Sequence, residues 1–364
     1  MHRDEIPTPA LVLDLPAFEA NIARMTAHAA THGKALRPHG KTHKCPEIAK
    51  RLVAAGAVGT CAAKLGEAEV FAAHGLRGLL VTTAVVGPAK AARAARLVKL
   101  APDTIVVADD AEAVRVLGDA AWRAGVTMRV AVDLYFGRTG VEPGFPARDI
   151  ARAIDGSPSL TFAGLQAYDG TASHTTPFDA RRARSLASMR AAIDTARLIA
   201  ADGIPCPLVT GGSTGTYRID AELDGVTELQ PGSFIFMDGD YGRIGGADGG
   251  AAYDDFQPAL SVVTTVVSVH GDDAIVDGGY KSFATDRPFT PIATSHGGLT
   301  YGWAGDEHGR LDMRHAAAPL KVGDRVSFQP PHCDPTVNLY DEIHAVRGDT
   351  VEAVWAIAAR GKSQ

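Results

Sequence analysis

The stretch with the most chemical potential is RPHGKTHK, residues 37–44, which holds two histidines and two lysines in eight residues. Four uses fit such a stretch: a solvated basic loop, a phosphate patch, a metal site, or a place where one lysine forms a covalent bond. The strand and helix expected around this stretch give the two lysines different positions. Lys41 would end a strand and point into a site, whereas Lys44 would begin the next helix and face solvent.

A second candidate is the glycine-rich run TGGSTGTY, residues 210–217. Glycine lets backbone N–H groups approach an anion closely, and serine and threonine hydroxyls add further donors. Gly232 and Ser233, in the run LQPGSF, would complete a phosphate cup. The run lacks the spacing and the lysine of a Walker loop, so a nucleoside triphosphate is not expected. Taken alone, such a loop is more often a plain flexible turn.

The third candidate is PPHCDPTVNL, residues 330–339. If this segment is extended, His332 and Asp334 lie on one side and Cys333 points away. A histidine and a carboxylate suit Zn²⁺, Mn²⁺ or another mixed nitrogen and oxygen site. A pair of this kind is by itself more often structural than metal-binding, so it needs support from elsewhere in the chain.

Alternating helix-like and strand-like stretches between about residues 17 and 240 must position these groups. Strands that alternate with helices form a parallel sheet, and eight such units over roughly 220 residues fit a (β/α)8 TIM-type barrel. An open doubly wound sheet is the alternative, although no GxGxxG motif follows the first strand. The predicted strands are 36–41, 59–64, 78–83, 104–109, 128–135, 160–168, 208–210 and 228–236.

After about residue 245 the helical period fades, and short strand-like runs alternate with Gly-Asp and Asp-Gly turns. This pattern of short strands and turns predicts a mainly β second domain. The early run TPALVLDL is strand-like as well and precedes the first helix. We therefore expect an α/β protein with a barrel over 17–244 and a mainly β domain built from 1–16 plus 245–364.

Reactive side chains lie where the predicted barrel strands end, which is where barrels carry their chemistry. Strand ends are exposed in any fold, but six of the eight strands share this feature, which favours an active site. A phosphate cup that faces a lysine is what pyridoxal phosphate (PLP) requires, because the lysine bonds its aldehyde while loops hold its phosphate. The residues at these strand ends are Lys41, Lys64, Asp109, Asp133 with Arg138 nearby, Gln166 with Tyr168 and Asp169, and Thr210, which opens the glycine-rich run after the seventh strand.

The composition is that of an ordinary globular protein, with 364 residues, 46% of them apolar and 21% charged. A formal net charge of −6 gives no reason to expect nucleic acid or an anionic membrane as a partner. The four cysteines are far apart, which argues for a reducing compartment. No signal-peptide core and no run of about 20 apolar residues is found, so we expect a cytoplasmic protein.

In their order along the chain, these motifs resemble the D-threonine aldolase and eukaryotic-type D-serine dehydratase family of fold-type III, alanine-racemase-like PLP enzymes. The resemblance covers essentially the whole chain and is nearest to metal-activated D-threonine aldolase. Each motif alone is weak, but the ordered set is specific. The motifs are TPALVLDL, RPHGKTHK, GAVGTCAAKLGEAEV, VDLYFGRTG, GLQAYDGTASH, TGGSTGTY, LQPGSFIFMD and PHCDPTVNL.

The resemblance implies a role for individual residues. Lys41 would form the Schiff base, Arg138 would face the pyridine side of the cofactor, and His332 and Asp334 would hold a divalent metal near the substrate's β-hydroxyl. Related dehydratases carry His-x-Cys at the metal position, so His-x-Asp favours an aldolase and suits Mn²⁺ or Mg²⁺ as well as Zn²⁺. The remaining cofactor residues would be Gln166, Tyr168, Thr210, Gly212, Ser213, Gly232 and Ser233, with Thr214 and Tyr217 matching less closely.

These roles imply retro-aldol cleavage of a small D-β-hydroxy-α-amino acid, for example of D-threonine to glycine and acetaldehyde. The base would be a metal-bound water or a histidine, for which His174 is the candidate; an exposed loop histidine is an equally good reading. A metal-dependent D-serine or D-3-hydroxy amino acid dehydratase is the main alternative. A non-catalytic PLP carrier would resemble the barrel alone, and a racemase would not need the metal pair. Related enzymes are mostly homodimers, so we expect a homodimer.

Overall fold

A computed structural model describes all 364 residues, and the chain folds into two compact units. The barrel unit comprises Met25–Lys41, Pro46–Gly232 and Gly361–Gln364. The β unit comprises Met1–Arg24, Thr42–Cys45 and Ser233–Arg360. Helix α1 (Leu15–Thr31) begins in the β unit and ends in the barrel unit.

Eight parallel strands form the sheet of the barrel unit, in the order β2-β9-β8-β7-β6-β5-β4-β3. A parallel bridge between His39 and Cys61, with the Cys61 N–H donating to the Pro38 carbonyl at 2.9 Å, joins the two ends of this order. The predicted barrel fold is therefore confirmed. The strands are β2 (Ala35–Leu36), β3 (Thr60–Ala62), β4 (Leu79–Val81), β5 (Ile105–Ala108), β6 (Met128–Asp133), β7 (Leu160–Ala167), β8 (Val209–Gly211) and β9 (Glu228–Leu229).

The first and last barrel strands are shorter than the sequence predicts. The prediction of 36–41 becomes β2 at Ala35–Leu36, and that of 228–236 becomes β9 at Glu228–Leu229. Pro38 and Pro231 follow these strands closely, and proline cannot donate to a sheet ladder. The chain after each proline forms a short 3-10 turn, and the candidates Lys41 and Ser233 lie on these turns rather than on strands.

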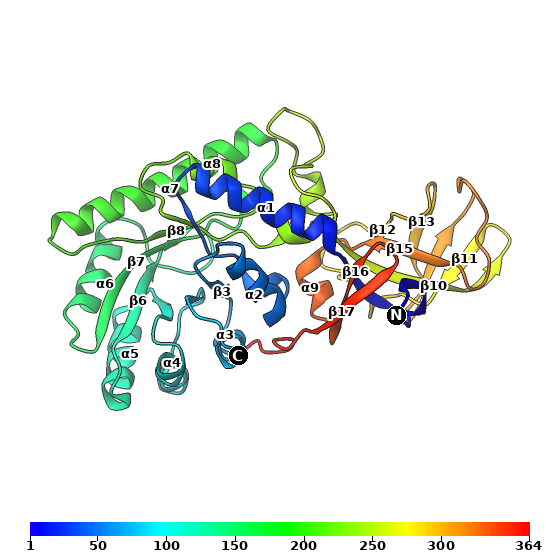
Figure 1. Cartoon of the computed structure of the whole chain (residues 1–364). Helices are drawn as coiled ribbons and strands as arrows, with labels where there is room; N and C mark the ends of the chain where they lie inside the picture. Colours follow the sequence, from blue (N-terminus) through cyan, green and yellow to red (C-terminus); the bar gives the residue numbers. More distant parts are fainter. The chain divides into compact units, whose positions relative to one another are not determined.

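Seven further helices connect the barrel strands, and α4 to α7 lie side by side along the sheet (Figure 1). Local signals set their ends; in α5, Asp110 accepts the N–H groups of Glu112 and Ala113, and Gly125 ends the helix at φ 65°. No helix is long and apolar enough to cross a membrane. The helices are α2 (Pro46–Ala54), α3 (Leu65–Ala73), α4 (Pro88–Leu100), α5 (Ala111–Ala124), α6 (Phe145–Asp155), α7 (Phe178–Ala201) and α8 (Tyr217–Ala221).

The barrel core is built from strands that are apolar without alternation. All four residues of β5 are buried, as expected for a parallel strand that is covered on both faces. One buried cluster joins residues of five neighbouring strands, namely Cys61, Leu80, Ile105, Val107, Ala131 and Ala163.

The β unit contains a nine-stranded sheet with the path β13-β14-β11-β10-β1-β16-β17. Strand β1 (Ala10–Asp14), from the run TPALVLDL, pairs antiparallel with β10 and parallel with β16. Strand β15 pairs with β10 and with β12, off this path. The other strands are β10 (Leu260–His270), β11 (Asp273–Val276), β12 (Ile292–Ala293), β13 (Thr300–Trp303), β14 (Gly309–Asp312), β15 (Arg325–Gln329), β16 (Glu342–Arg347) and β17 (Thr350–Ala356).

The expectation that residues 330–339 are extended is wrong, because Cys333–Val337 form the short helix α9. His332 is the residue that precedes the helix, with extended backbone angles, and Thr336 Oγ1 donates to its carbonyl at 2.7 Å. Asp334 lies in the first turn, where a negative charge stabilises a helix. The sequence pattern missed this helix because it is only five residues long.

Candidate active site

A cavity of about 290 Å³ opens in the barrel unit at the carboxyl ends of its strands. It gathers four of the predicted cofactor residues: Lys41, Arg138, Gln166 and Tyr168. These residues follow or end three different strands, so barrel closure brings together groups that are far apart in sequence. The complete lining is His39, Lys41, Ala63, Lys64, Thr82, Thr83, Arg138, Thr139, Gln166, Tyr168 and Gln230.

Lys41 lies in the 3-10 turn η2 (Gly40–Thr42), and His39 fixes this turn. The backbone N–H of Lys41 donates to His39 Nδ1 at 3.3 Å, and His39 Nε2 lies 3.1 Å from Thr82 Oγ1. Because Nδ1 accepts, the imidazole carries its proton on Nε2 and donates it to Thr82. His39 therefore positions the turn that presents the Lys41 side chain to the cavity.

The second half of the RPHGKTHK stretch belongs to the β unit. His43 is fully buried, its Nδ1 accepts the Cys45 N–H at 3.0 Å, and burial lowers its pKa to about 3. The imidazole is therefore neutral, although the nearby Asp334 carboxylate favours its protonation. The expectation that Lys44 faces solvent is wrong, because this residue is 8% exposed. The backbone turns at Lys44, with a φ of 50°, before α2 begins.

Gln166 presents a buried hydrogen-bond acceptor to the cavity. Its Nε2 donates to the Thr82 carbonyl and to Asp133 Oδ1, both at 2.9 Å, so both amide hydrogens are used. Its Oε1 is buried and accepts no hydrogen bond from the protein, and a buried acceptor of this kind needs a ligand that donates. Asp133 is 4% exposed and also accepts from Thr139 at 2.9 Å; burial raises its pKa to about 6.

The cavity wall is cationic. It contains Lys41, Lys64 and Arg138, and no carboxylate lines it. The Arg138 guanidinium lies over the Tyr168 ring, 5.2 Å from its centroid, which holds a planar cation beside a planar ring. A wall with this charge balance favours an anionic ligand.

The glycine-rich loop runs from β8 to α8, and a buried carboxylate supports it. Gly212 has a φ of 77°, and a Cβ atom there would lie 2.6 Å from Asp220 Oδ2, so only glycine fits without strain. Asp220 accepts from Thr216 Oγ1 at 2.6 Å and from Ser185 Oγ at 2.5 Å. Burial raises the pKa of Asp220 to about 6. Thr216 in turn accepts the N–H of Ser213 at 3.0 Å, so the loop has a defined shape.

The other predicted phosphate residues are placed in different ways. Thr210 is fully buried in β8; its hydroxyl donates to Glu228 at 2.7 Å and accepts from Gln230 at 2.9 Å. Both hydrogen bonds of this hydroxyl are therefore made inside the protein, and of its two partners Gln230 is the one that lines the cavity. Thr214 is fully buried in the loop, where the Arg181 guanidinium donates to the neighbouring Gly215 carbonyl at 3.0 Å.

Four candidates lie at the ends of other elements or chain segments. Tyr217 is the first residue of α8 and is 2% exposed. Gly232 is the last residue of its barrel segment, and Ser233 begins the 3-10 turn η4 (Ser233–Ile235) of the β unit. His174 ends the 3-10 turn η3 (Ala172–His174) after β7 and does not line the Lys41 cavity.

The proposed metal pair lies at the start of α9. Asp286 accepts a hydrogen bond from His332 Nδ1 at 2.7 Å, which leaves Nε2 of the ring available as a ligand. Cys333 does not point away from Asp334 as expected, because its Sγ donates to Asp334 Oδ1 at 3.4 Å. Burial raises the pKa of the Cys333 thiol, which keeps it protonated. No cluster of three or more histidine, cysteine, aspartate or glutamate side chains is arranged as a metal cage.

A charged network that the sequence did not reveal surrounds His332. Arg287 donates to Asp240 at 2.8 Å and contacts Asp286 at 3.1 Å, so one arginine braces two carboxylates. Asp238 is fully buried and accepts the Cys333 N–H at 2.7 Å; burial raises its pKa. Asp286 lies 46 residues from His332, and no motif spacing links the two.

Both sets of residues can be tested for fit to the groups that their chemistry implies. The Lys41 cavity combines a lysine, cationic walls and an unsatisfied buried acceptor, which fits a planar anionic aldehyde cofactor. The His332 and Asp334 pair offers one nitrogen and one carboxylate. That set fits a cation that keeps several waters, such as Mn²⁺ or Mg²⁺, better than a structural zinc site with four protein ligands.

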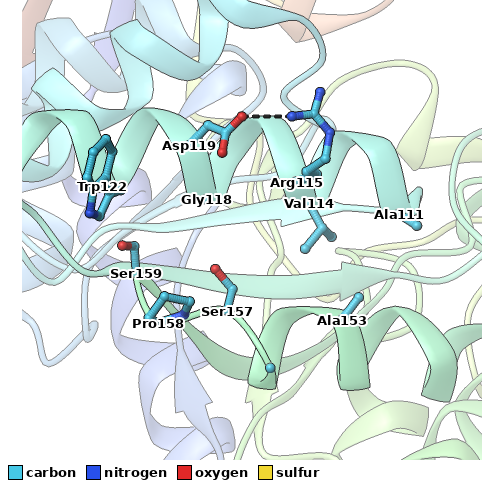
Figure 2. Close-up of a pocket in the computed structure, with 11 residues that line it drawn as sticks. Ala111, Val114, Arg115, Gly118, Asp119, Trp122, Ala153, Ser157, Pro158 and Ser159 are labelled. Carbon is cyan, nitrogen blue, oxygen red and sulfur yellow. Dashed lines mark hydrogen bonds and ion pairs between the residues drawn. The ribbon is translucent and has the colours of Figure 1, made fainter.

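A second cavity, of about 330 Å³, lies between α5 and the turn that joins α6 to β7 (Figure 2). Small apolar side chains and Trp122 form most of its wall. Arg115, its one cation, is paired with Asp119 at 2.7 Å and with Glu112. None of the candidate site residues lines this cavity, which separates it from the Lys41 site.

Comparison with known families covers both parts of the chain. Residues 13–240 match the family model of the alanine racemase N-terminal domain, and residues 259–346 match the putative serine dehydratase domain. The chain is 40% identical to a D-threonine aldolase of Arthrobacter sp., over 99% of this chain and 94% of the relative. It is 38% identical to a 3-hydroxy-D-aspartate aldolase of Paracoccus denitrificans, over 100% of this chain and 94% of the relative.

Solved structures agree with these relatives. The D-threonine aldolase from Filomicrobium marinum superposes with a TM-score of 0.92 at 37% identity, covering 99% of this chain and 98% of that one. The D-threo-3-hydroxyaspartate dehydratase from Delftia sp. HT23 gives a TM-score of 0.87 at 27% identity, covering 98% of each chain. With Lys41 in a cavity at the strand ends of the matching barrel, the chain belongs to the D-threonine aldolase and 3-hydroxy-D-aspartate aldolase group of the alanine-racemase-like, PLP-dependent lyases.

Proposed function

We propose that this enzyme cleaves D-β-hydroxy-α-amino acids by a retro-aldol reaction, taking D-threonine to glycine and acetaldehyde. The observation that carries the proposal is the cavity in which Lys41 meets Arg138, Gln166 and Tyr168 at the strand ends of the barrel. The activities named for the two aldolase relatives support the same reaction class.

Lys41 is the residue that we propose to bond the PLP aldehyde. When bound, PLP supplies a ring that takes up the electron pair of the Cα–Cβ bond. Arg138, which lies over the Tyr168 ring, and Tyr168 would contact the cofactor, and the Gln166 Oε1 acceptor would take a hydrogen bond from the bound group. The loop at Gly212, Ser213 and Thr214 would hold the phosphate, and Thr210 would contribute through its hydrogen bond to Gln230.

Gly232 and Ser233 are also proposed as phosphate residues. Their support is the short 3-10 turn that begins at Ser233, where backbone N–H groups are available to an anion. The barrel over 17–244 and the mainly β domain of 1–16 plus 245–364 remain our proposed functional division.

His332 and Asp334 are proposed to hold a divalent metal, Mn²⁺, Mg²⁺ or Zn²⁺. The metal would supply Lewis acidity that lowers the pKa of the substrate's β-hydroxyl. In support of this role, the hydrogen bond from His332 Nδ1 to Asp286 leaves Nε2 available as a ligand. His174 is proposed as the base that takes the hydroxyl proton.

A dehydratase acting on D-serine or a D-3-hydroxy amino acid is the second candidate. The observation that favours it is the thiol of Cys333, which lies 3.4 Å from Asp334 Oδ1 and is a second polar group beside the proposed metal pair. In that reaction Lys41 would take the Cα proton and the metal would assist departure of the hydroxyl.

One assay separates the two reactions. The PLP-loaded enzyme is incubated with D-threonine and Mn²⁺, with EDTA in a parallel sample. Acetaldehyde with glycine, lost on chelation, identifies the aldolase, whereas 2-oxobutanoate identifies the dehydratase. L-threonine and a Lys41→Ala variant serve as controls. If D-threonine, D-serine and 3-hydroxy-D-aspartate all remain intact with Mn²⁺, both proposals fail.

We further propose a homodimer and a cytoplasmic location. The dimer rests on the likeness to related enzymes. The location is supported by the cysteines, since no disulfide joins Cys45, Cys61, Cys206 or Cys333. Gel filtration with light scattering checks the first, and fractionation of the source cells checks the second.

A further inference from the structure

Lys64 is a positively charged residue of the Lys41 cavity that no step of the proposed reaction uses. It follows β3 directly and precedes α3, and its side chain is one of the cavity's lining groups. Lys41 is taken by the cofactor aldehyde, and Arg138 lies on the Tyr168 ring. Lys64 is the third positive charge in a wall that contains no carboxylate.

The ammonium group of Lys64 has no carboxylate partner within the protein. Glu67, one turn further along, does not neutralise it. Glu67 Oε2 instead accepts the backbone N–H of Ala63 at 2.7 Å and that of Lys64 at 3.4 Å. These bonds fix the backbone at Lys64, so its side chain leaves the strand end in a defined direction.

A partly enclosed ammonium group without a partner favours a bound anion, because its charge is otherwise only partly solvated. The phosphate has its own proposed donors on the Gly212 loop. The one other anionic group shared by every α-amino acid is its carboxylate. We propose that Lys64 binds the α-carboxylate of the substrate, an inference that rests on the proposed function in the same cavity.

The consequence is a division of labour in the cavity. Lys41 and Arg138 hold the cofactor, whereas Lys64 recognises the amino acid and orients the bonds at its Cα. Lys64 then determines which ligands bind, because an amine that lacks the carboxylate gains nothing from it.

The test removes the charge from the protein and from the ligand separately. The PLP-loaded wild type, Lys64→Met and Lys64→Arg are titrated with glycine and with ethanolamine, in which a hydroxymethyl group replaces the carboxylate. Binding is followed through the cofactor's absorbance, without turnover. Lys90→Met, an exposed lysine of α4 outside the cavity, is the matched control.

We expect Lys64→Met to weaken glycine binding roughly tenfold or more, since a hydrogen bond between charged groups is lost. Ethanolamine binding should stay within about twofold of wild type, and Lys64→Arg should restore much of the glycine affinity. With D-threonine, KM should rise by a similar factor while kcat changes little. Equal cofactor absorbance in all variants excludes a loss of PLP.

Two results would overturn the assignment: unchanged glycine affinity in Lys64→Met, or an equal loss of affinity for glycine and ethanolamine. Failure of the proposed reaction gives a different result. If glycine binding depends on Lys64 but D-threonine is not cleaved, the carboxylate site stands and the aldolase proposal falls.

Discussion

Removing the Asp286 carboxylate should weaken metal binding although Asp286 is not proposed as a ligand. The hydrogen bond from His332 Nδ1 to Asp286 Oδ2 is 2.7 Å long, the length of a charge-assisted bond. It fixes the ring so that Nε2 is the free nitrogen, and it raises the basicity of that nitrogen. Without it, the imidazole must be ordered by the metal itself.

The size of the effect follows from burial. A hydrogen bond to a charged group contributes about 1.5–3 kcal/mol, or roughly 10- to 150-fold in Kd. The Asp286 side chain is 40% exposed and the His332 side chain 17%, so solvent screens part of this energy. We expect Asp286→Ala to raise the Kd for Mn²⁺ roughly tenfold. Asp286→Asn should cost less, about threefold, because the amide oxygen still accepts from Nδ1.

The assay measures metal binding without turnover. The enzyme is stripped with EDTA, dialysed and titrated with Mn²⁺, and free Mn²⁺ is read from its paramagnetic resonance signal. Asp312→Asn is the matched control, since Asp312 also pairs with an arginine of the β unit, at the end of β14. An Asp286→Ala variant that binds Mn²⁺ with the wild-type Kd would refute the argument, as would an equal loss in Asp312→Asn.

Three further predictions concern the barrel unit. Lys41→Arg should keep the fold and the unfolding midpoint but lose the absorbance band of covalently bound PLP, because a guanidinium does not condense with the aldehyde. Its kcat should fall at least about 1,000-fold. A retained band would contradict the assignment of Lys41. Gly212→Ala should lower the free energy of unfolding by about 2–4 kcal/mol, because the new Cβ would lie 2.6 Å from Asp220 Oδ2 and the φ of 77° would be strained. A urea titration measures this loss. In the control variant Gly203→Ala, which is also at positive φ but has open space around it, the loss should be only about 1 kcal/mol. Asp220 has a raised pKa of about 6 in the folded state, so the folded chain binds more protons than the unfolded chain between about pH 4 and pH 6. The free energy of unfolding should therefore fall by about 3 kcal/mol as the pH rises through this window. Asp220→Asn should flatten that part of the profile of urea midpoint against pH, and an unchanged slope would refute the role of this group.

Much of the fold could be read from local sequence. Continuous apolar strands such as β5, alternating with capped helices such as α5, require a parallel sheet covered on both faces. Lys41 and the loop at Gly212 stood out because their residue types and their positions after strands both point to a site. These features depend on neighbours within a few residues, so periodicity and turn chemistry are enough to find them.

Tertiary structure decided which side chains meet. Gln166 Oε1 is left as an unbonded acceptor only because the Thr82 carbonyl, just after β4, and Asp133 of β6 take both amide hydrogens. Thr210 looked available in sequence, yet its hydroxyl is bonded to Glu228 and Gln230. Such pairings depend on sheet register and closure, which no single stretch of sequence encodes.

The RPHGKTHK stretch shows where the two sources of information divide. Its residue types identified Lys41 as a reactive candidate, and the turn after Pro38 gives that lysine its place in the cavity. The sequence did not reveal that Lys44 is buried, that His43 is held neutral, or that Asp286 orients His332. Residue type and local spacing determine which chemistry is available, whereas burial and long-range contacts determine which of those groups is free to perform it.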